Sequence, residues 1–121
     1  MPSQKTLDDF IATVLSGRHD EAIERFYTPD ATMQENLNPP RKGRDGLVAR
    51  ERAVMARFAQ IHSFREGPVF VNGDHVVIRW VFRFVAADGS GFTMDEMAYQ
   101  RWEGEKIAEE RFYYDPAQRG G

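Results

Sequence analysis

Four side chains in this sequence could hold or transfer a proton inside a folded domain: Glu35, His62, Glu110 and Tyr114. A glutamate becomes an effective general base when burial raises its pKa toward the working pH. A histidine titrates near neutral pH and can act as acid or base, and a tyrosine hydroxyl can donate a hydrogen bond to a developing negative charge. These residue types indicate proton-transfer chemistry.

The chain lacks the residues that several other chemistries need. It has no cysteine, which excludes disulfides, thiolate metal sites and a cysteine nucleophile and fits a reducing cytoplasm. Its three histidines are too far apart to suggest a metal site, and no phosphate-binding glycine loop or serine nucleophile elbow occurs. We therefore expect chemistry without a metal or a cofactor.

Charge and hydropathy also exclude classes of partner. The net charge is −3 and acids and bases are interspersed, so the chain has no general attraction to a phosphate backbone. No stretch approaches the ~18 consecutive apolar residues of a membrane span, and the N-terminus does not resemble a signal peptide. We predict a cytoplasmic protein that binds neither nucleic acid nor membranes.

The first half of the chain has mainly helical periodicity. Apolar residues recur at the spacing of one helical face in Leu7, Phe10, Ile11, Val14 and Leu15. Thr6 opens a capping-box pattern for this helix, and a second, shorter helix is predicted over residues 20–26. A short strand over 31–36 and a proline-rich basic loop follow, and Asp45 is a good N-cap for a third helix.

The second half is typical of an antiparallel sheet. Runs of β-branched and aromatic residues are separated by turn signals at Asn72-Gly73, Asp88-Gly89-Ser90-Gly91 and Glu103-Gly104. These signals predict a meander of four strands over 62–71, 75–86, 92–102 and 106–115. Helices first and an antiparallel sheet second predict a single α+β domain over residues 1–121.

The predicted strand over 75–86 has two different faces. One face is wholly apolar: Val76, Ile78, Trp80, Phe82 and Phe84. The opposite face alternates valines with arginines: Val77, Arg79, Val81, Arg83 and Val85. We expect helices or a cavity against the first face, with Trp80 as part of the wall, and a homodimer interface or a partly wet surface on the second.

The segment Phe26-Tyr27-Thr28-Pro29-Asp30-Ala31-Thr32 resembles the F-x-x-D-A signature of the nuclear transport factor 2-like superfamily, nearest its SnoaL-like and ketosteroid-isomerase-like members. Two more segments agree in order and spacing, Gly43–Gly46 and the final strand around 104–115. The resemblance implies a cone-shaped fold, in which a curved antiparallel sheet packs on three N-terminal helices around an apolar pocket, and a dimer. It indicates the fold more strongly than the function, because the superfamily holds isomerases, cyclases, hydratases and members without known activity.

The resemblance also implies a general base. The position of the isomerase's base is taken by Glu35, which alternates with Met33 and should face inward with it. The two donors that stabilise the enolate in the isomerase correspond to Phe10 and, approximately, Ala98. A phenyl ring and a methyl group cannot donate a hydrogen bond, so steroid isomerisation by that mechanism is not expected.

Glu110, Phe112 and Tyr114 share one face of the last strand, and the resemblance assigns that face to the pocket. Glu110 could pair with Glu35 so that one carboxyl stays protonated, or it could belong to a charged strand surface. Tyr114 could supply the missing hydroxyl donor or pack at the rim of the pocket. His62 falls where relatives line the pocket and could act as acid or base or be structural, while His19 and His75 are predicted to be exposed.

The residues expected to line the pocket are Phe10, Val14, Met33, Phe58, Ile78, Trp80, Phe82, Glu96, Ala98 and Phe112. Glu96 could instead mark the solvated start of its strand. The leading hypothesis is a cofactor-independent isomerase, lyase or cyclase that acts on a small apolar carbonyl compound, with Glu35 as base. The alternative is a ligand-binding or dimerisation module of the same fold without catalysis.

Overall fold

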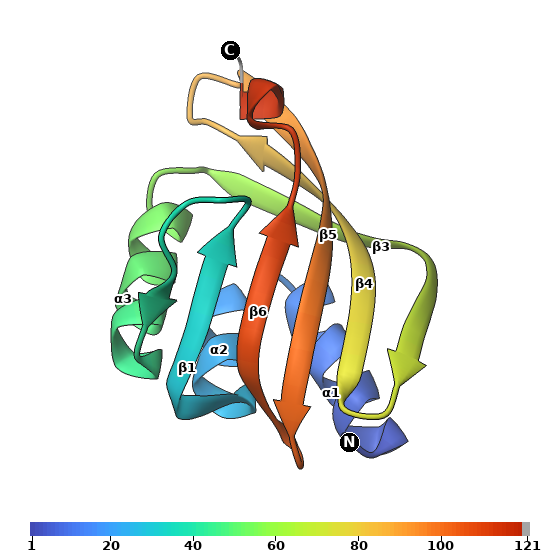
Figure 1. The fold of residues 1–121 in the computed structure, drawn as a ribbon. Coiled ribbons are helices and arrows are strands. Elements are labelled where there is room, and N and C mark those ends of the chain that lie inside the picture. The colour runs from blue at the N-terminus through green and yellow to red at the C-terminus, as the bar shows by residue number, and fades with distance from the viewer. Residues whose placement is uncertain (120–121) are drawn as a thin grey trace.

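The computed structural model describes residues 1–119 of the chain. Its elements, in order, are α1 (Gln4–Leu15), α2 (His19–Phe26), β1 (Tyr27–Glu35), β2 (Arg41–Lys42), α3 (Arg44–Met55), β3 (Gln60–Asn72), β4 (His75–Val85), β5 (Gly91–Glu103), β6 (Lys106–Tyr113) and the 3-10 turn η1 (Pro116–Arg119). The strands form one curved sheet in the order β2-β1-β6-β5-β4-β3 (Figure 1). Neighbouring strands are antiparallel except β1 and β6, which are parallel.

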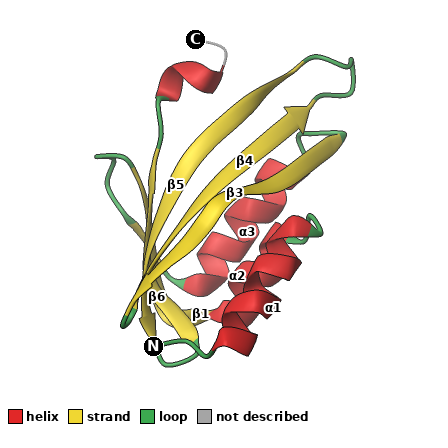
Figure 2. Cartoon of the chain, turned by 90° about the vertical axis from the view of Figure 1, so that its right-hand side faces the viewer, coloured by secondary structure: helices red, strands yellow, loops and turns green. Residues whose placement is uncertain are grey.

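The three helices cover one face of this sheet, as the view in Figure 2 shows. The sheet curves around them without closing, so the predicted α+β architecture is confirmed. The meander of β3 to β6 is also confirmed, with strand ends within two residues of those predicted. We call the face under the helices the inner face and the opposite one the outer face.

The inner face of β4 carries the core. Val76 and Ile78 are 0% exposed and Trp80 is 2% exposed, as the strand's apolar alternation predicts. Phe10 of α1 packs edge-to-face against Trp80 at a ring-centroid distance of 6.5 Å and against Trp102 at 5.8 Å. These aromatic contacts fix α1 over β4 and β5.

Four local predictions are wrong. The strand expected over 31–36 begins four residues earlier, at Tyr27, directly after α2. The cap of α1 is Ser3, whose Oγ accepts from the Thr6 amide at 3.1 Å, so the helix begins before Thr6. Gly43 caps α3 with a φ of 107°, which places Asp45 in the first turn instead. Arg41 and Lys42 are exposed but form the edge strand β2 rather than part of a loop, because Lys42 pairs with Thr32 and the Gly43 amide donates to the Ala31 carbonyl at 2.8 Å.

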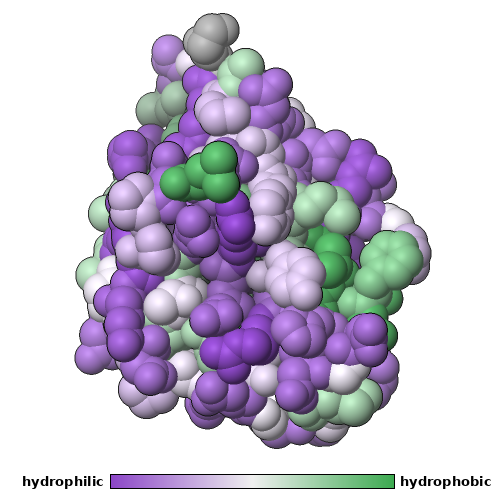
Figure 3. All heavy atoms as spheres, viewed as in Figure 1, coloured by the Kyte–Doolittle hydropathy of each residue, from purple (hydrophilic) through white to green (hydrophobic). Residues whose placement is uncertain are grey.

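The outer face has a mixed surface. Figure 3 shows this side of the molecule as mostly hydrophilic, with apolar residues gathered toward the β3–β4 side. Its large apolar side chains are between 38% and 60% exposed: Phe64, Phe70, Met97, Tyr99 and Tyr113. Charged pairs lie between them, among them Arg79 with Asp95 and Arg101 with Glu109.

Candidate functional site

A cavity of about 390 Å³ lies between the inner face and the helices. Its apolar wall consists of Phe10, Val14, Ala22, Ile23, Met33, Leu47, Val54, Phe58, Trp80, Phe82, Phe84, Phe92, Met94 and Phe112. Its polar lining consists of His19, Tyr27, Glu35, Arg41, Arg50, Glu51, Arg57, Glu96, Glu110 and Arg119. Apolar walls with a few convergent polar groups are typical of a small-molecule site.

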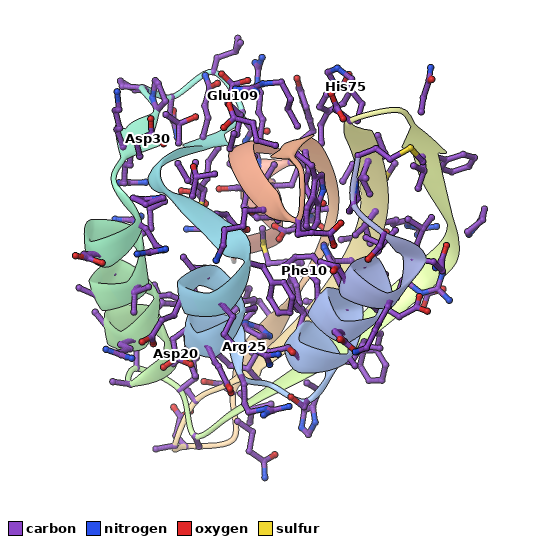
Figure 4. The ribbon with its side chains drawn as sticks, turned by 90° about the horizontal axis from the view of Figure 1, so that it is seen from below. Phe10, Asp20, Arg25, Asp30, His75 and Glu109 are labelled. Carbon is purple, nitrogen blue, oxygen red and sulfur yellow. The ribbon has the colours of Figure 1, made fainter. Side chains whose placement is uncertain are left out.

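Most of the residues that the sequence assigns to the pocket lie on this wall, but two do not. In Figure 4, seen from below, Phe10 points from α1 into the space between helices and sheet. Ile78 and Ala98 share the inner face yet are 0% exposed, and they belong to the core rather than to the cavity lining. Both residues belong to the buried core cluster that also includes Leu7 and Phe10 of α1, so no cavity surface is left at their side chains.

Glu35 lies at the end of β1, where the backbone fixes its side chain against the cavity. Asn36 next to it has a positive φ of 51°, a conformation that asparagine tolerates better than most residues. The Asn36 side chain accepts from the Tyr114 amide at 2.9 Å, and its carbonyl accepts from Arg111 Nε at 2.9 Å. These bonds join the ends of β1 and β6 and bring Tyr114 next to Glu35.

The two oxygens of Glu35 differ in their partners. Oε1 accepts from the Tyr114 hydroxyl at 2.9 Å and from Arg119 Nη2 at 3.0 Å. Oε2 has only longer contacts, to Arg41 Nη1 at 3.5 Å and to Arg50 Nη2 at 3.7 Å. Burial and the neighbouring Glu35 raise the pKa of Tyr114 to about 12, so its hydroxyl stays protonated and donates a hydrogen bond to Oε1.

Glu110 lies deeper, in a chain of buried hydrogen bonds, and is 3% exposed. Its Oε1 accepts from the Tyr27 hydroxyl, and its Oε2 accepts from Gln100 Nε2 at 2.7 Å. The Gln100 carbonyl oxygen in turn accepts from the indole of Trp102 at 3.0 Å. Burial raises the pKa of Glu110 to about 7, although both hydrogen bonds act in the opposite direction.

Glu96 completes the set of inner carboxyl groups. It stands opposite Trp80 in the β4–β5 register and lines the cavity, which favours the pocket reading over a solvated strand start. Burial raises its pKa to about 8, and the charges of Glu110 and Glu35 add to this effect. Glu96 is therefore mainly protonated at neutral pH and can donate a hydrogen bond or a proton.

The histidines are arranged differently from the prediction. His62 is exposed on the outer face, where it bonds to Gln60 at 3.1 Å, so its assignment to the pocket is wrong. The cause is strand alternation, because β3 begins two residues before His62 and turns that side chain outward. His19 lines the cavity instead, with Nε2 at 2.7 Å from Ser63 Oγ and Nδ1 at 3.5 Å from Glu51.

Several polar groups of the site had no place in the sequence-based prediction. Tyr27 could have been suspected, because it directly follows Phe26 in the recognised motif and begins β1. Arg119 reaches Glu35 from 84 residues away, and no local pattern indicates that contact. Protonated Glu96 supplies a hydrogen-bond donor to a cavity whose expected donor positions, Phe10 and Ala98, have none.

Within residues 1–119, no group of three or more histidine, aspartate or glutamate side chains is placed to hold a metal ion. No helix of this part is long and apolar enough to cross a membrane.

Comparisons with known proteins agree with this architecture. A solved candidate SnoaL-like polyketide cyclase from Mesorhizobium loti is 28% identical, with a TM-score of 0.74 over 91% of this chain and 97% of that one. A protein with a ketosteroid-isomerase-like fold from Catenulispora acidiphila, solved in complex with trimethylamine, is 20% identical, with a TM-score of 0.77 over 98% of this chain and 94% of that one. TerC, co-crystallised with polyporic acid, is 16% identical, with a TM-score of 0.76 over 93% and 91%.

A search of curated proteins gave no match. The sequence model of the SnoaL-like domain, in contrast, matches residues 7–110, which is most of the chain and includes both Glu35 and Glu110. The chain therefore belongs to the SnoaL-like family.

Proposed function

We propose that this protein is a cofactor-independent isomerase, lyase or cyclase that moves protons on a small, largely apolar carbonyl compound. The observation that carries the proposal is the placement of Glu35 and Glu96 on the wall of one apolar cavity with opposite surroundings. Glu35 lies among three arginines, whereas the pKa of Glu96 is raised to about 8. Carboxyl groups whose environments separate their protonation states can act as base and acid at one pH.

The proposed roles follow from the contacts. Oε2 of Glu35, which has only the longer contacts, takes a proton from the carbon next to the substrate carbonyl, and the electron pair moves to the carbonyl oxygen. Protonated Glu96 donates a hydrogen bond to the resulting enolate, and Glu110, whose pKa is raised to about 7, lines the same cavity and is a second donor in its protonated form. The enolate then takes the proton back from Glu35 at another atom, or it attacks a second carbonyl to close a ring and the alkoxide that forms takes that proton, which restores the Glu35 carboxylate.

The relatives support a small-molecule ligand. One structural neighbour is a candidate polyketide cyclase, and two others were solved with trimethylamine and with polyporic acid, which fits binding of small molecules. Phenylalanine, tryptophan and methionine side chains make up much of the cavity wall, so the body of the ligand should be apolar. A cytoplasmic location remains part of this proposal.

Proton abstraction can be tested before the substrate is known. Small cyclic β-diketones and aryl ketones are incubated with the protein in D₂O, and ¹H NMR follows the loss of their α C–H signals. We expect faster exchange than in buffer for at least one compound, and a decrease of about 10²–10⁴-fold for Glu35→Gln. The wild-type rate should fall as pH rises past about 8, where Glu96 loses its proton.

Glu109→Gln is the matched control, because Glu109 is the neighbour of Glu110 on the outer face and pairs with Arg101 at 3.2 Å. It should exchange deuterium at the wild-type rate. If Glu35→Gln and Glu96→Gln both retain the wild-type rate, the proposed roles are wrong.

Binding without catalysis is the second candidate. It is favoured by the contacts of Glu35 Oε1, which already accepts from Tyr114 and Arg119 in the manner of a structural anion. The same compounds distinguish the two functions. Saturable binding of compounds that show no exchange above buffer would favour a carrier or sensor over an enzyme.

We also infer that two copies associate through the outer face. Phe64, Met97, Tyr99 and Tyr113 are exposed there, between 38% and 51%, in a surface that also carries arginine–acid pairs. An apolar patch within a polar surface is typical of a protein interface.

A further inference from the structure

The cavity is lined by more arginine side chains than its charged acids can neutralise. Arg41 on β2, Arg50 on α3, Arg57 in the turn after α3 and Arg119 on η1 all line it. Three of them, Arg41, Arg50 and Arg119, converge on the single carboxylate of Glu35. We call these three the arginine cluster. Within residues 1–119, Arg57 has no acidic partner within 4.0 Å.

The other acids of the cavity do not balance this charge. Glu51 lies beside His19 at 3.5 Å, away from the ion pairs of Glu35. Glu96 and Glu110 have pKa values raised to about 8 and about 7, so Glu96 is mainly neutral and Glu110 is partly neutral at pH 7. Four guanidinium groups therefore face little more than the charges of Glu35 and Glu51.

The arginine cluster also has unused hydrogen-bonding capacity. Each guanidinium has five N–H donors in a planar fork that matches a carboxylate. Arg41 and Arg50 reach the same oxygen, Oε2, from 3.5 and 3.7 Å, at or beyond the limit of a good hydrogen bond. Their side chains are 47% and 45% exposed, so an incoming group can approach them.

We propose that the ligand of this cavity is an organic acid, whose apolar body lies against the aromatic wall and whose carboxylate binds between Arg41 and Arg50. This inference rests on the proposed function and names its substrate class. The ligand carboxylate would give the guanidinium groups of Arg41 and Arg50 the close hydrogen bonds that they do not make with Glu35 Oε2. By drawing these two guanidinium groups away from Oε2, it would also leave that oxygen freer to accept a proton.

A matched pair of probes separates charge from shape. 2-Naphthylacetic acid and its methyl ester have the same apolar body, and only the acid is anionic at pH 7. Isothermal titration calorimetry should give at least about tenfold tighter binding of the acid, the factor that 1.4 kcal/mol represents. Added KCl should weaken binding of the acid more than binding of the ester.

Variants then assign the effect to the arginine cluster. Arg50→Met keeps much of the side-chain length and removes the charge, and it should lower affinity for the acid about tenfold and affinity for the ester much less. Arg52→Met is the control on the same helix, because Arg52 pairs with Asp20 and Glu24 and does not line the cavity. It should bind both probes as the wild type does, and circular dichroism checks that both variants fold.

Three results would overturn the inference: no binding of the acid, equal affinity for acid and ester, or an unchanged acid preference in Arg50→Met. Tighter binding of 2-naphthyl phosphate than of the acid would also overturn the assignment to a carboxylate. The proposed function fails separately. Preference for the acid without deuterium exchange would exclude the catalytic proposal and keep the anion site. Deuterium exchange without preference for the acid would exclude the anion site and keep the catalytic proposal.

Discussion

The inner and outer faces of the sheet treat neighbouring acids in opposite ways. Asp95 points outward and forms two hydrogen bonds with Arg79, at 2.9 and 2.6 Å, which hold its pKa below the usual value. Glu96, the next residue, points inward, and burial raises its pKa to about 8. The same contrast recurs on β6, where exposed Glu109 pairs with Arg101 and Glu110 is buried.

The difference shows that strand alternation decides whether the pKa of an acid on this sheet is lowered or raised. Successive side chains face opposite sides of a sheet. Asp95 therefore lies in water beside a guanidinium group, whereas Glu96, the next residue of β5, lies against the apolar cavity. Desolvation disfavours the charged form of an acid, and an arginine favours it. Neighbours in the sequence can therefore be used as matched controls, because they share a strand and differ in their surroundings.

The largest effect should come from breaking the buried network. Gln100 is 0% exposed and joins Glu110 to Trp102, so Gln100→Leu leaves a carboxyl oxygen and an indole N–H without their partners. We expect a loss of about 2–6 kcal/mol in the free energy of unfolding, since each of the two unsatisfied buried groups costs about 1–3 kcal/mol. Urea denaturation measures it.

Arg101→Leu on the outer face is the control for this variant. Arg101 is the next residue, pairs with Glu103 and Glu109, and is 36% exposed. Its loss should change stability by less than about 0.5 kcal/mol, as exposed substitutions usually do. Equal losses for the two variants would mean that the network contributes no more than a surface ion pair.

A smaller effect is expected in the pH dependence of stability. The folded-state pKa of Glu96, about 8, lies above its ordinary value of 4.5, so the folded protein binds more protons than the unfolded chain between these pH values. The contribution of protonated Glu96 to the stability of the fold is therefore fully present below about pH 4.5 and is lost as pH rises to about 8. Glu96→Gln should remove this loss. Its free energy of unfolding at pH 8.5 should be about 1–3 kcal/mol larger than that of the wild type.

Asp95→Asn should leave the alkaline side of the stability curve unchanged, because the pKa of Asp95 is lowered and its titration lies at acid pH. The measurement is thermal unfolding of both variants from pH 5 to 9. A wild-type midpoint that does not fall over this range would contradict the raised pKa of Glu96.

The alternation rule also explains how much the sequence could predict. The apolar stripe of Val76, Ile78 and Trp80 identified the inner face, because burial of one face repeats every second residue. His62 was assigned to the pocket from the resemblance to relatives, and the alternation of β3, in which His62 pairs with Arg83, turns it to the outer face instead.

Contacts between distant segments were not predictable in this way. Arg119 and Arg50 reach Glu35 from η1 and α3, and their positions depend on how those elements pack around the end of β1. The pair of Tyr27 with Glu110 depends on the parallel pairing of β1 and β6, including its irregularity between Tyr27 and Thr32. Neither arrangement follows from periodicity, since both are set by tertiary packing.

The outer face offers a test of association. Met97 is 38% exposed, beside Arg79 and Tyr113 in the register, and Met97→Glu should reduce dimer formation through that face. Light scattering at several protein concentrations should show a wild-type dimer and a monomeric variant, with deuterium exchange retained. Ala53→Glu adds the same charge on the exposed surface of α3 and should remain a dimer. A monomeric wild type would exclude the dimer.

The smallest effect should come from the Arg79–Asp95 pair, whose side chains are 49% and 43% exposed. Arg79→Met should lower the unfolding temperature slightly at low salt, and the difference should vanish near 1 M NaCl, where charges are screened within about 3 Å. Because the pKa of Asp95 is lowered, its stabilisation is present above its ordinary value of 3.8 and is lost as pH falls through the folded pKa. The variant should therefore differ from wild type at neutral pH and converge with it in acid, whereas Glu96→Gln differs most in alkali. If both variants changed the same side of the pH profile, the two faces would not impose opposite environments on their acids.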